Sequence, residues 1–360
     1  MSIQDYIEKM KNIHRNLLCF LDESHDEEEH YQNLIQNLKD QKISENRHEL
    51  KTLLYMLSKI SNHHCRENHL FEKIEKIYKI FENDIKEKFT NYEIFKISKG
   101  NKKLLQFLFD ENILTIDEMI ENDLIKTKKK LSDFFIFLFP EKSLKLGLIQ
   151  ELDDDFHSKR KIGENDDIIC ELIRQDSIEQ FIVYVEQNDI SIDSIINHSI
   201  FETNAFLLKQ KETTLIEYAS FFGSSQIFKY LQKNKATINP IKIWLYAIHG
   251  NDEEIIQILK ENKNLKENKN QPPFYSYECI KESVKCHNDN MLNYLKNNYN
   301  IDVIDESIFS YCFQYYNFLY FPKEIDNIYY FYYACKYDHY TIVEYFLKTK
   351  SIDIKAKIIS

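Results

Sequence analysis

Glycine and proline are scarce in this chain of 360 residues, which contains five of each. An all-β protein needs many tight turns, and these are the two residues that such turns use most. The sequence also lacks a Gly-x-Gly-x-x-Gly loop, a Walker loop, a Gly-x-Ser-x-Gly elbow and a His-Glu-x-x-His helix. These absences argue against a β-rich fold and against the common nucleotide-binding, serine-hydrolase and zinc-protease chemistries.

Paired cysteines are missing as well. The seven cysteines are scattered, their number is odd, and no Cys-x-x-Cys occurs. This pattern fits reduced thiols, so a cytoplasmic protein is expected, with the nucleus as the alternative. The N-terminus is charged and has no apolar stretch of the kind found in signal peptides. The most apolar run, residues 134–139, stops at Pro140, far short of the ~20 residues of a membrane helix. We therefore expect no membrane association.

An excess of positive charge is also absent, because the formal net charge is -11. Nucleic-acid binding usually leaves a basic footprint, so no nucleic-acid partner is expected. The one dense basic run, at residues 126–130, is interpreted as a solvated helix end. Hydrophobic residues make up 43% of the chain, including 25 Phe and 24 Tyr. That supply is enough for a continuous core and argues against disorder.

Helical periodicity runs through most of the chain. In residues 6–21 and again in residues 70–89, apolar side chains recur at three- and four-residue spacing, with charged residues between them. After Asn91 the helical segments become shorter and come in pairs, which is typical of stacked helical hairpins.

Four of these pairs superimpose. In each, a small residue, here called the anchor, precedes an apolar pair by eight residues. Weaker copies occur at residues 95–108 and 168–185. The spacing predicts a small side chain where two helices cross and apolar contacts on the helix that follows. The anchors are Ala219, Ala247, Ser283 and Ala334, and their apolar pairs are Ile227 with Phe228, Ile255 with Ile256, Met291 with Leu292, and Ile342 with Val343.

Residues 214–231 resemble the ankyrin pattern Thr-Pro-Leu-His-x-Ala-Ala-x-x-Gly-His-x-x-Ile-Val-x-x-Leu-Leu. Ala219 takes the first Ala position, Gly223 the Gly position, and Tyr230 with Leu231 the Leu-Leu positions. Two features depart from the pattern. Thr214-Leu-Ile-Glu lacks the Pro and His, and the anchors stand 28 (219 to 247), 36 (247 to 283) and 51 (283 to 334) residues apart instead of roughly 33. The last gap holds the aromatic stretch 311–322, interpreted as an extra helix.

The whole layout is also similar to a group of ankyrin proteins of unicellular eukaryotes that carry an N-terminal helical domain of unknown function. Residues 170–174, 199–204 and 214–231 carry this similarity. It implies an all-α, ankyrin-type helical-hairpin solenoid with an N-terminal helical region, and no established activity. The expected regions are 1–90 (N-terminal helices), 91–210 (degenerate hairpin repeats) and 211–360 (ankyrin-like repeats).

The resemblance places partner binding on the second and third residues after each anchor, at the turn tips and on the concave face. The alternative for Phe221 and Phe222 is packing on a neighbouring hairpin. Phe, His, Lys and Tyr on such a face suit a protein partner, because aromatic anchors dominate binding hot spots. The expected partner-binding residues are Phe221, Phe222, His249, Lys285, Lys336 and Tyr337.

No cofactor, catalytic residue or metal site is expected. The nearest metal candidate is His63-His64-Cys65 with His69, which lacks a paired set of four ligands and is interpreted as a polar loop. Cys286 and His287 with Cys279 form a weaker candidate, since the first two fall in a repeat turn.

The sequence thus predicts a non-catalytic scaffold that binds unknown protein partners through the concave face of the stack. The alternatives are a structural or self-associating protein and, less favoured, an enzyme of unrecognised type in the N-terminal helices. Self-association is considered because the last repeat needs a cap, and the tail, residues 351–360, is too short for a full repeat. That tail either folds back as a partial cap or leaves an end that self-associates.

Overall fold

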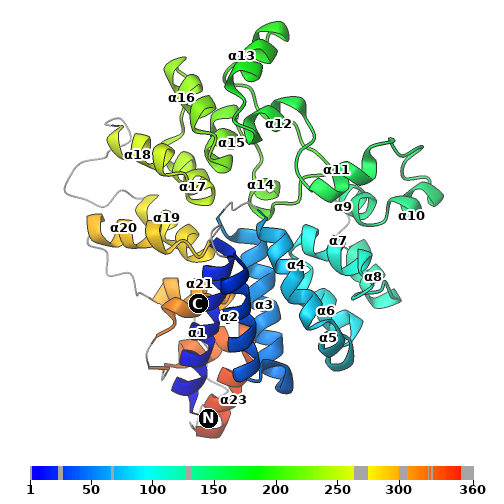
Figure 1. Ribbon diagram of the computed structural model, residues 1–360, viewed down its shortest axis with the longest axis vertical. Helices are drawn as coiled ribbons and strands as arrows, with labels where there is room; N and C mark the ends of the chain where they lie inside the picture. The colour runs from blue at the N-terminus through cyan, green and yellow to red at the C-terminus, as the bar shows by residue number, and fades with distance from the viewer. Residues whose placement is uncertain are drawn as a thin grey trace. The chain divides into compact units, whose positions relative to one another are not determined.

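The computed structural model describes residues 2–22, 27–65, 69–126, 131–262, 275–299, 306–322, 324–325 and 327–349. Within these residues the chain forms α-helices and short 3-10 helices without a β-strand, as expected for an all-α fold (Figure 1). Two compact units are present. Unit 1 combines Met1–Lys88 with Ser276–Ser360, and unit 2 is Phe89–Tyr275. Among the described helices, none is both long enough and apolar enough to cross a bilayer.

Unit 1 joins helices from the two ends of the chain. Its N-terminal helices are amphipathic, with the apolar side chains of α1 buried at three- and four-residue spacing. Its elements are α1 (Ile3–Asp22), α2 (Glu27–Asp40), η1 (Ile43–Glu45), α3 (Arg47–His63), α4 (Leu70–Ile80), α5 (Glu82–Lys88), α19 (Tyr275–Lys285), α20 (Asp289–Tyr299), α21 (Glu306–Tyr315), η3 (Phe318–Tyr320), α22 (Ile328–Lys336) and α23 (Tyr340–Thr349).

The two ends share one core. Helix α1 packs on η3 and α23, and α3 packs on α21 and α23. The Tyr6 ring of α1 meets Phe318 edge-on, with 6.4 Å between centroids. Tyr55 of α3 stacks on Tyr316 at 4.9 Å. The N-terminal helices therefore complete the hydrophobic core of the C-terminal hairpins, and they cover the apolar side of α23, the last described helix.

Unit 2 begins with short helices and continues into regular hairpins. Two of its helices start with a capping box, at Thr90–Glu93 and at Thr214–Glu217. Its elements are α6 (Asn91–Ser98), α7 (Lys102–Asp110), α8 (Glu118–Lys126), α9 (Leu131–Leu138), α10 (Pro140–Lys145), α11 (Phe156–Ile162), α12 (Ile168–Arg174), α13 (Ile178–Gln187), α14 (Ala205–Lys209), α15 (Leu215–Phe222), α16 (Ser225–Lys233), α17 (Pro240–Gly250) and α18 (Glu253–Glu261).

Three hairpins of unit 2 stack side by side. The first helices pack in the order α12, α15, α17, and the second helices in the order α13, α16, α18. At the crossing of α15 and α17 the backbones come very close, because a Cβ added to Gly250 would lie 2.2 Å from the carbonyl oxygen of Ser220. A glycine at this place is what allows the two helices to approach.

The same turn closes each hairpin at the four anchors, all of which are at most 1% exposed. Four residues after each anchor the backbone is left-handed, at Gly223, Asn251, His287 and Asp338. In three hairpins the next N–H then donates to the anchor carbonyl at 2.9 Å, which is the Schellman geometry. These bonds join Ser224 to Ala219, Asn288 to Ser283, and His339 to Ala334.

The compact units differ from the three regions expected from the sequence. A boundary does fall near residue 90, but residues 91–210 and 211–275 lie in one unit, and residues 276–360 belong with the N-terminal helices.

The C-terminal tail, residues 351–360, lies outside the described residues. The last described hairpin is covered by α1 and α3, so the argument from an uncapped end for self-association loses its basis.

Candidate functional site

In unit 2, two of the three residues expected to bind a partner are buried. Phe221 is 0% exposed, and its ring stacks on Phe206 of α14 with 5.8 Å between centroids. His249 is also 0% exposed, with its ring 4.2 Å from Phe206. Phe222 is half-buried beside Tyr218. The expectation that Phe221 and His249 lie on an open face is wrong, because α14 supplies an aromatic side chain that fills the space beside them.

The other three expected residues lie in unit 1. Lys336 is exposed and Tyr337 is half-buried. Lys285 is only 7% exposed: its Nζ lies 2.6 Å from Glu282 and 6.0 Å from the centre of the Tyr315 ring. Burial of Lys285 is a second departure from the expected exposed position, although its ammonium still lies beside an aromatic ring of the next helix.

Unit 1 contains a hairpin that the anchor spacing did not reveal. Helix α21 ends at Tyr315, the next residue, Tyr316, is left-handed with φ 55°, and the N–H of Asn317 donates to the carbonyl of Cys312 at 3.0 Å. Cys312 therefore takes the anchor place. The residues two and three positions later are Gln314 and Tyr315. They correspond to Lys285 with Cys286 at the end of α19 and to Lys336 with Tyr337 at the end of α22.

These helices together present what we call the tyrosine–lysine face. Lys281 lies 4.5 Å from the centre of the Tyr277 ring and 5.5 Å from that of Tyr311. Tyr311 stacks on Tyr315 at 6.0 Å. The face consists of Tyr277, Lys281 and Lys285 of α19, Tyr311, Gln314 and Tyr315 of α21, and Tyr332, Lys336 and Tyr337 at α22.

Contacts continue across the face from α21 to α22. The Tyr337 hydroxyl donates to Gln314 Oε1 at 3.4 Å. Lys336 Nζ lies 5.6 Å from the centre of the Tyr332 ring and 5.3 Å from that of Tyr337. Aromatic rings thus alternate with ammonium groups from one helix to the next, and cation–π attraction holds them together.

The three lysines of the face differ in their charge partners. Lys281 pairs with Glu278 at 3.0 Å, and Lys285 pairs with Glu282. Lys336 makes no ion pair with a carboxylate in the part of the chain that the structure describes. The neighbouring Tyr337 raises the pKa of Lys336, so this side chain stays charged. Its ammonium group lies within 6 Å of the centres of both the Tyr332 and the Tyr337 rings.

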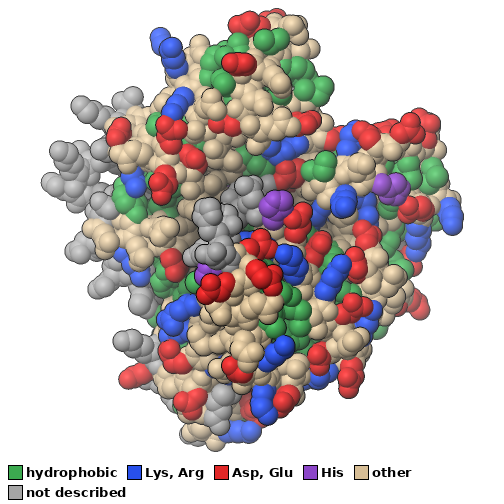
Figure 2. Space-filling model, viewed as in Figure 1, with side chains coloured by type: hydrophobic (Ala, Val, Ile, Leu, Met, Phe, Trp, Pro, Cys, Tyr) green, Lys and Arg blue, Asp and Glu red, His purple; other side chains and the backbone are tan. Residues whose placement is uncertain are grey.

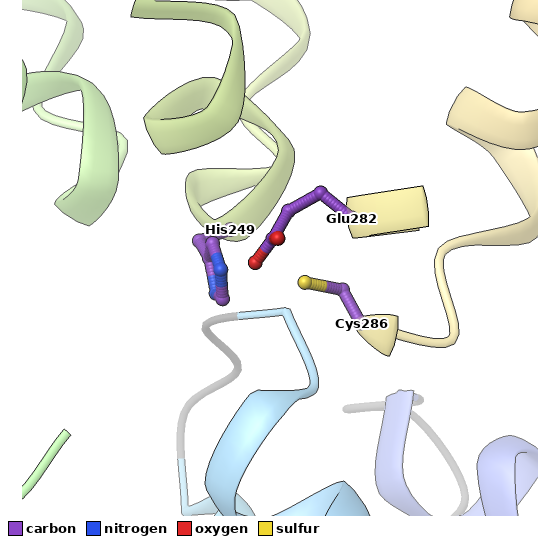
Figure 3. Close-up of side chains that lie close together, drawn as sticks. All are labelled: His249, Glu282 and Cys286. Carbon is purple, nitrogen blue, oxygen red and sulfur yellow. The ribbon is translucent and has the colours of Figure 1, made fainter. Parts of the chain in front are cut away.

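The buried cysteines Cys286, just after α19, and Cys312, on α21, are unsuited to nucleophilic chemistry. Cys286 directly follows α19, four residues after Glu282, and Figure 3 shows these two side chains close together. Burial is the main cause that raises the pKa of Cys286 well above its usual value, and it raises that of Cys312 to about 12. Both stay protonated thiols at neutral pH, whereas a reactive cysteine needs a thiolate. His249, also drawn in Figure 3, is a unit 2 residue packed against Phe206 and Phe221.

The histidines considered as metal ligands have separate partners inside unit 1. His63 meets the Tyr315 ring edge-on at 5.2 Å. His64 contacts the carboxylate of Asp22 and donates from Nδ1 to the carbonyl of Cys286 at 2.9 Å. His69 is exposed and pairs with Glu72. Each of the three rings thus has a partner of its own: the Tyr315 ring, the Asp22 carboxylate with the Cys286 carbonyl, and the Glu72 carboxylate.

Comparison with protein-family models, with curated proteins and with solved structures finds no match to this chain. The geometry and chemistry of the tyrosine–lysine face are therefore the basis on which a function can be assigned.

Proposed function

We propose that this chain is a non-catalytic scaffold that binds a protein partner through the tyrosine–lysine face. The observation that carries the proposal is the repetition of one surface chemistry on three first helices, α19, α21 and α22. Each contributes tyrosine, and α19 and α22 contribute lysine, at places set by the hairpin turn. A row of this kind is how a stack of repeats builds an extended binding surface.

Tyrosine and lysine together favour a protein ligand. A tyrosine ring provides a large contact area with little loss of side-chain freedom, and tyrosine is enriched among binding hot spots. Lys336 would pair with a carboxylate of the partner, while Tyr332 and Tyr337 cover apolar atoms around it. The net charge of -11 disfavours nucleic acid as the ligand.

The proposal includes an ankyrin-type organisation of the hairpins. Its support is the shared turn at the four anchors, with a left-handed residue four positions on, together with the two parallel rows of helices in unit 2. Seven free cysteines fit a reducing compartment, so we place the protein in the cytoplasm or the nucleus.

Affinity purification from the native cell tests this proposal. The bait is the full chain, compared with Tyr332→Ala/Lys336→Ala. Both residues are exposed, so their removal leaves the core intact. Loss of a hot-spot pair costs roughly 2 kcal/mol or more, and we expect the specific partner to be recovered at about tenfold lower yield or less.

The matched control is Leu347→Ala/Lys348→Ala, an exposed apolar–lysine pair on α23 that lies outside the face. This control should recover the same partner as the wild type. If all three folded baits recover identical proteins in identical amounts, the tyrosine–lysine face is not the binding surface.

A further inference from the structure

An apolar groove runs along the first hairpin of the stack in unit 2, on the side that does not face α15 and α16. Its volume is about 390 Å³. Ile168 is 54% exposed and Val183 is 50% exposed, which is unusual for aliphatic side chains placed next to each other. The groove is lined by Ile168 and Leu172 of α12 and by Glu179, Gln180, Val183, Tyr184 and Gln187 of α13.

The groove follows from helical spacing. Ile168 and Leu172 are four residues apart on α12 and form an apolar stripe. From α13, Val183 and Tyr184 supply apolar surface, and the other lining residues of that helix are polar. Other side chains of the same helices, such as Ile173 and Phe181, are 0% exposed and pack into the hairpin stack. The hairpin thus has two apolar sides, and only one of them is covered.

The two helices that form the groove carry more acidic than basic side chains. They have three Glu residues, at positions 171, 179 and 186, and Arg174 is their single Lys or Arg. That arginine is already engaged, because its Nε lies 2.9 Å from Glu164 and its Nη1 donates to the backbone of Asn165. Figure 2 shows hydrophobic and acidic side chains together at the top of the view, where Figure 1 places α13.

We propose that this groove binds an amphipathic helix of a partner protein whose apolar stripe is flanked by lysine or arginine. Two neighbouring helices that both supply apolar side chains to one groove form a cradle for a third helix, with anchors spaced as i, i+3, i+4 and i+7. Acidic side chains on the two helices favour a bound helix with lysine or arginine beside its apolar stripe. These are Glu179 in the lining, Glu171 on α12 and Glu186 on α13. A second copy of this chain is disfavoured, because pairing the groove with itself would bring two acidic rims together.

This site is independent of the tyrosine–lysine face, since it belongs to the other unit and selects the opposite charge. A protein with both surfaces would connect two partners of different character, one that presents a carboxylate to Lys336 and one that presents a basic helix to α12 and α13.

Fluorescence anisotropy with the full chain and synthetic peptides tests the inference. The probes are a panel of fluorescein-labelled helical peptides of about 18 residues, long enough to form helix, with Leu or Ile at the four anchor positions and Lys or Arg beside them. A second panel keeps the apolar stripe and replaces every Lys and Arg by Glu. We expect saturable binding of the basic panel, at least about tenfold tighter than the acidic panel, and weakening as salt is raised.

The variant Val183→Asp places a charge in the groove at an exposed position and should weaken binding of the basic panel at least about tenfold. Ile241→Asp is the matched control, because Ile241 is 44% exposed on α17 and does not line the groove; it should bind as the wild type does. Glu179→Lys should reduce the difference in affinity between the basic and the acidic peptide panels.

Three results would overturn the proposal. The first is the absence of saturable binding by any basic peptide, and the second is equal affinity for both panels. The third is a dimer of the wild-type chain in light scattering that Val183→Asp dissociates, which would assign the groove to a second copy of this chain.

Discussion

Two buried histidines of unit 1 share a hydrogen bond although they are far apart in sequence. His14 Nε2 of α1 and His287 Nδ1, in the turn after α19, lie 3.0 Å apart. Only one of these facing nitrogens can carry a proton while the bond is kept. Burial lowers the pKa of His14 to about 3, with smaller contributions from His64 and Arg15. Burial also holds the pKa of His287 well below its usual value, so both rings are neutral at pH 7.

We predict that unit 1 loses stability as the pH falls below about 6.5, the ordinary pKa of histidine in an unfolded chain. Below that pH the two histidines are protonated in the unfolded state but stay neutral in the folded state. The unfolding free energy then falls by about 1.4 kcal/mol per pH unit for each histidine. The stability is fully present above pH 6.5. His14→Gln cannot be protonated there, so urea unfolding by circular dichroism at pH 7.5 and pH 5.0 should show a smaller loss for this variant.

The control for this prediction is His157→Gln, which removes an exposed histidine of unit 2. It should keep the pH dependence of the wild type. An equal loss of unfolding free energy between pH 7.5 and 5.0 in His14→Gln and in the wild type would contradict the prediction.

At the same scale, the offset from an anchor locates the candidate binding residues. That offset fixes the place of a residue in the turn, and Lys336 and Tyr337 are accessible there. The offset does not determine how deeply the side chain is buried. Phe221 and His249 hold equivalent places but are buried by Phe206, which lies on a five-residue helix too short to give a periodic signal.

At the scale of helices, the approach of α15 and α17 depends on one residue. A Cβ at position 250 would meet the backbone of Ser220 at 2.2 Å, and a backbone atom cannot move aside as a side-chain end can. We predict that Gly250→Ala lowers the unfolding free energy of unit 2 by roughly 1–3 kcal/mol, the usual cost of overpacking. Fluorescence of Trp244, the single tryptophan, follows the unfolding of α17 directly.

Gly100→Ala serves as the matched substitution, since a Cβ at Gly100 meets no atom within 4 Å. It should change the unfolding free energy by well under 1 kcal/mol or raise it slightly. If Gly250→Ala is equally neutral, the close crossing of α15 and α17 is not formed in solution.

Periodicity found most of the helices but missed one hairpin. Helix α21 has a cysteine at the anchor place, and the left-handed residue that follows is Tyr316. Left-handed turns usually contain glycine or asparagine, and a bulky residue at positive φ is rare. The sequence therefore gives no sign of this turn. Aromatic packing holds it instead: Tyr316 stacks on Tyr55 at 4.9 Å and on His339 at 4.2 Å. From spacing alone, residues 311–322 therefore indicate only an extra helix within an overlong gap between anchors.

At the scale of the whole chain, unit 1 is built from two segments separated by all of unit 2. Sequence patterns report which face of a helix is apolar, but not which distant helix covers it. A boundary near residue 90 could be predicted from the change in helix length. The packing of residues 276–360 on α1 and α3 could not be predicted, because a long-range contact such as that of Tyr6 with Phe318 does not affect the local spacing of apolar residues.

We predict that a fragment of residues 89–275 folds alone, whereas a fragment of residues 276–360 does not. The first retains the stacked hairpins and Trp244, and should unfold cooperatively by fluorescence and circular dichroism. The second lacks α1 and α3, against which α21, η3 and α23 pack. Adding residues 1–88 as a separate peptide should restore helical signal. A cooperative transition of the isolated 276–360 fragment would contradict this account.

The divided construction of unit 1 has a consequence for biosynthesis. The ribosome releases α1 and α3 first, yet the helices that cover them are made last. At roughly 5–20 residues per second, translation of the 187 residues of unit 2 (89 to 275) takes roughly 10–40 seconds. Unit 2 can fold during this interval, while the apolar side chains of the N-terminal helices remain exposed to solvent. Chaperones that hold such helices should therefore influence how much of the newly made protein reaches its native state.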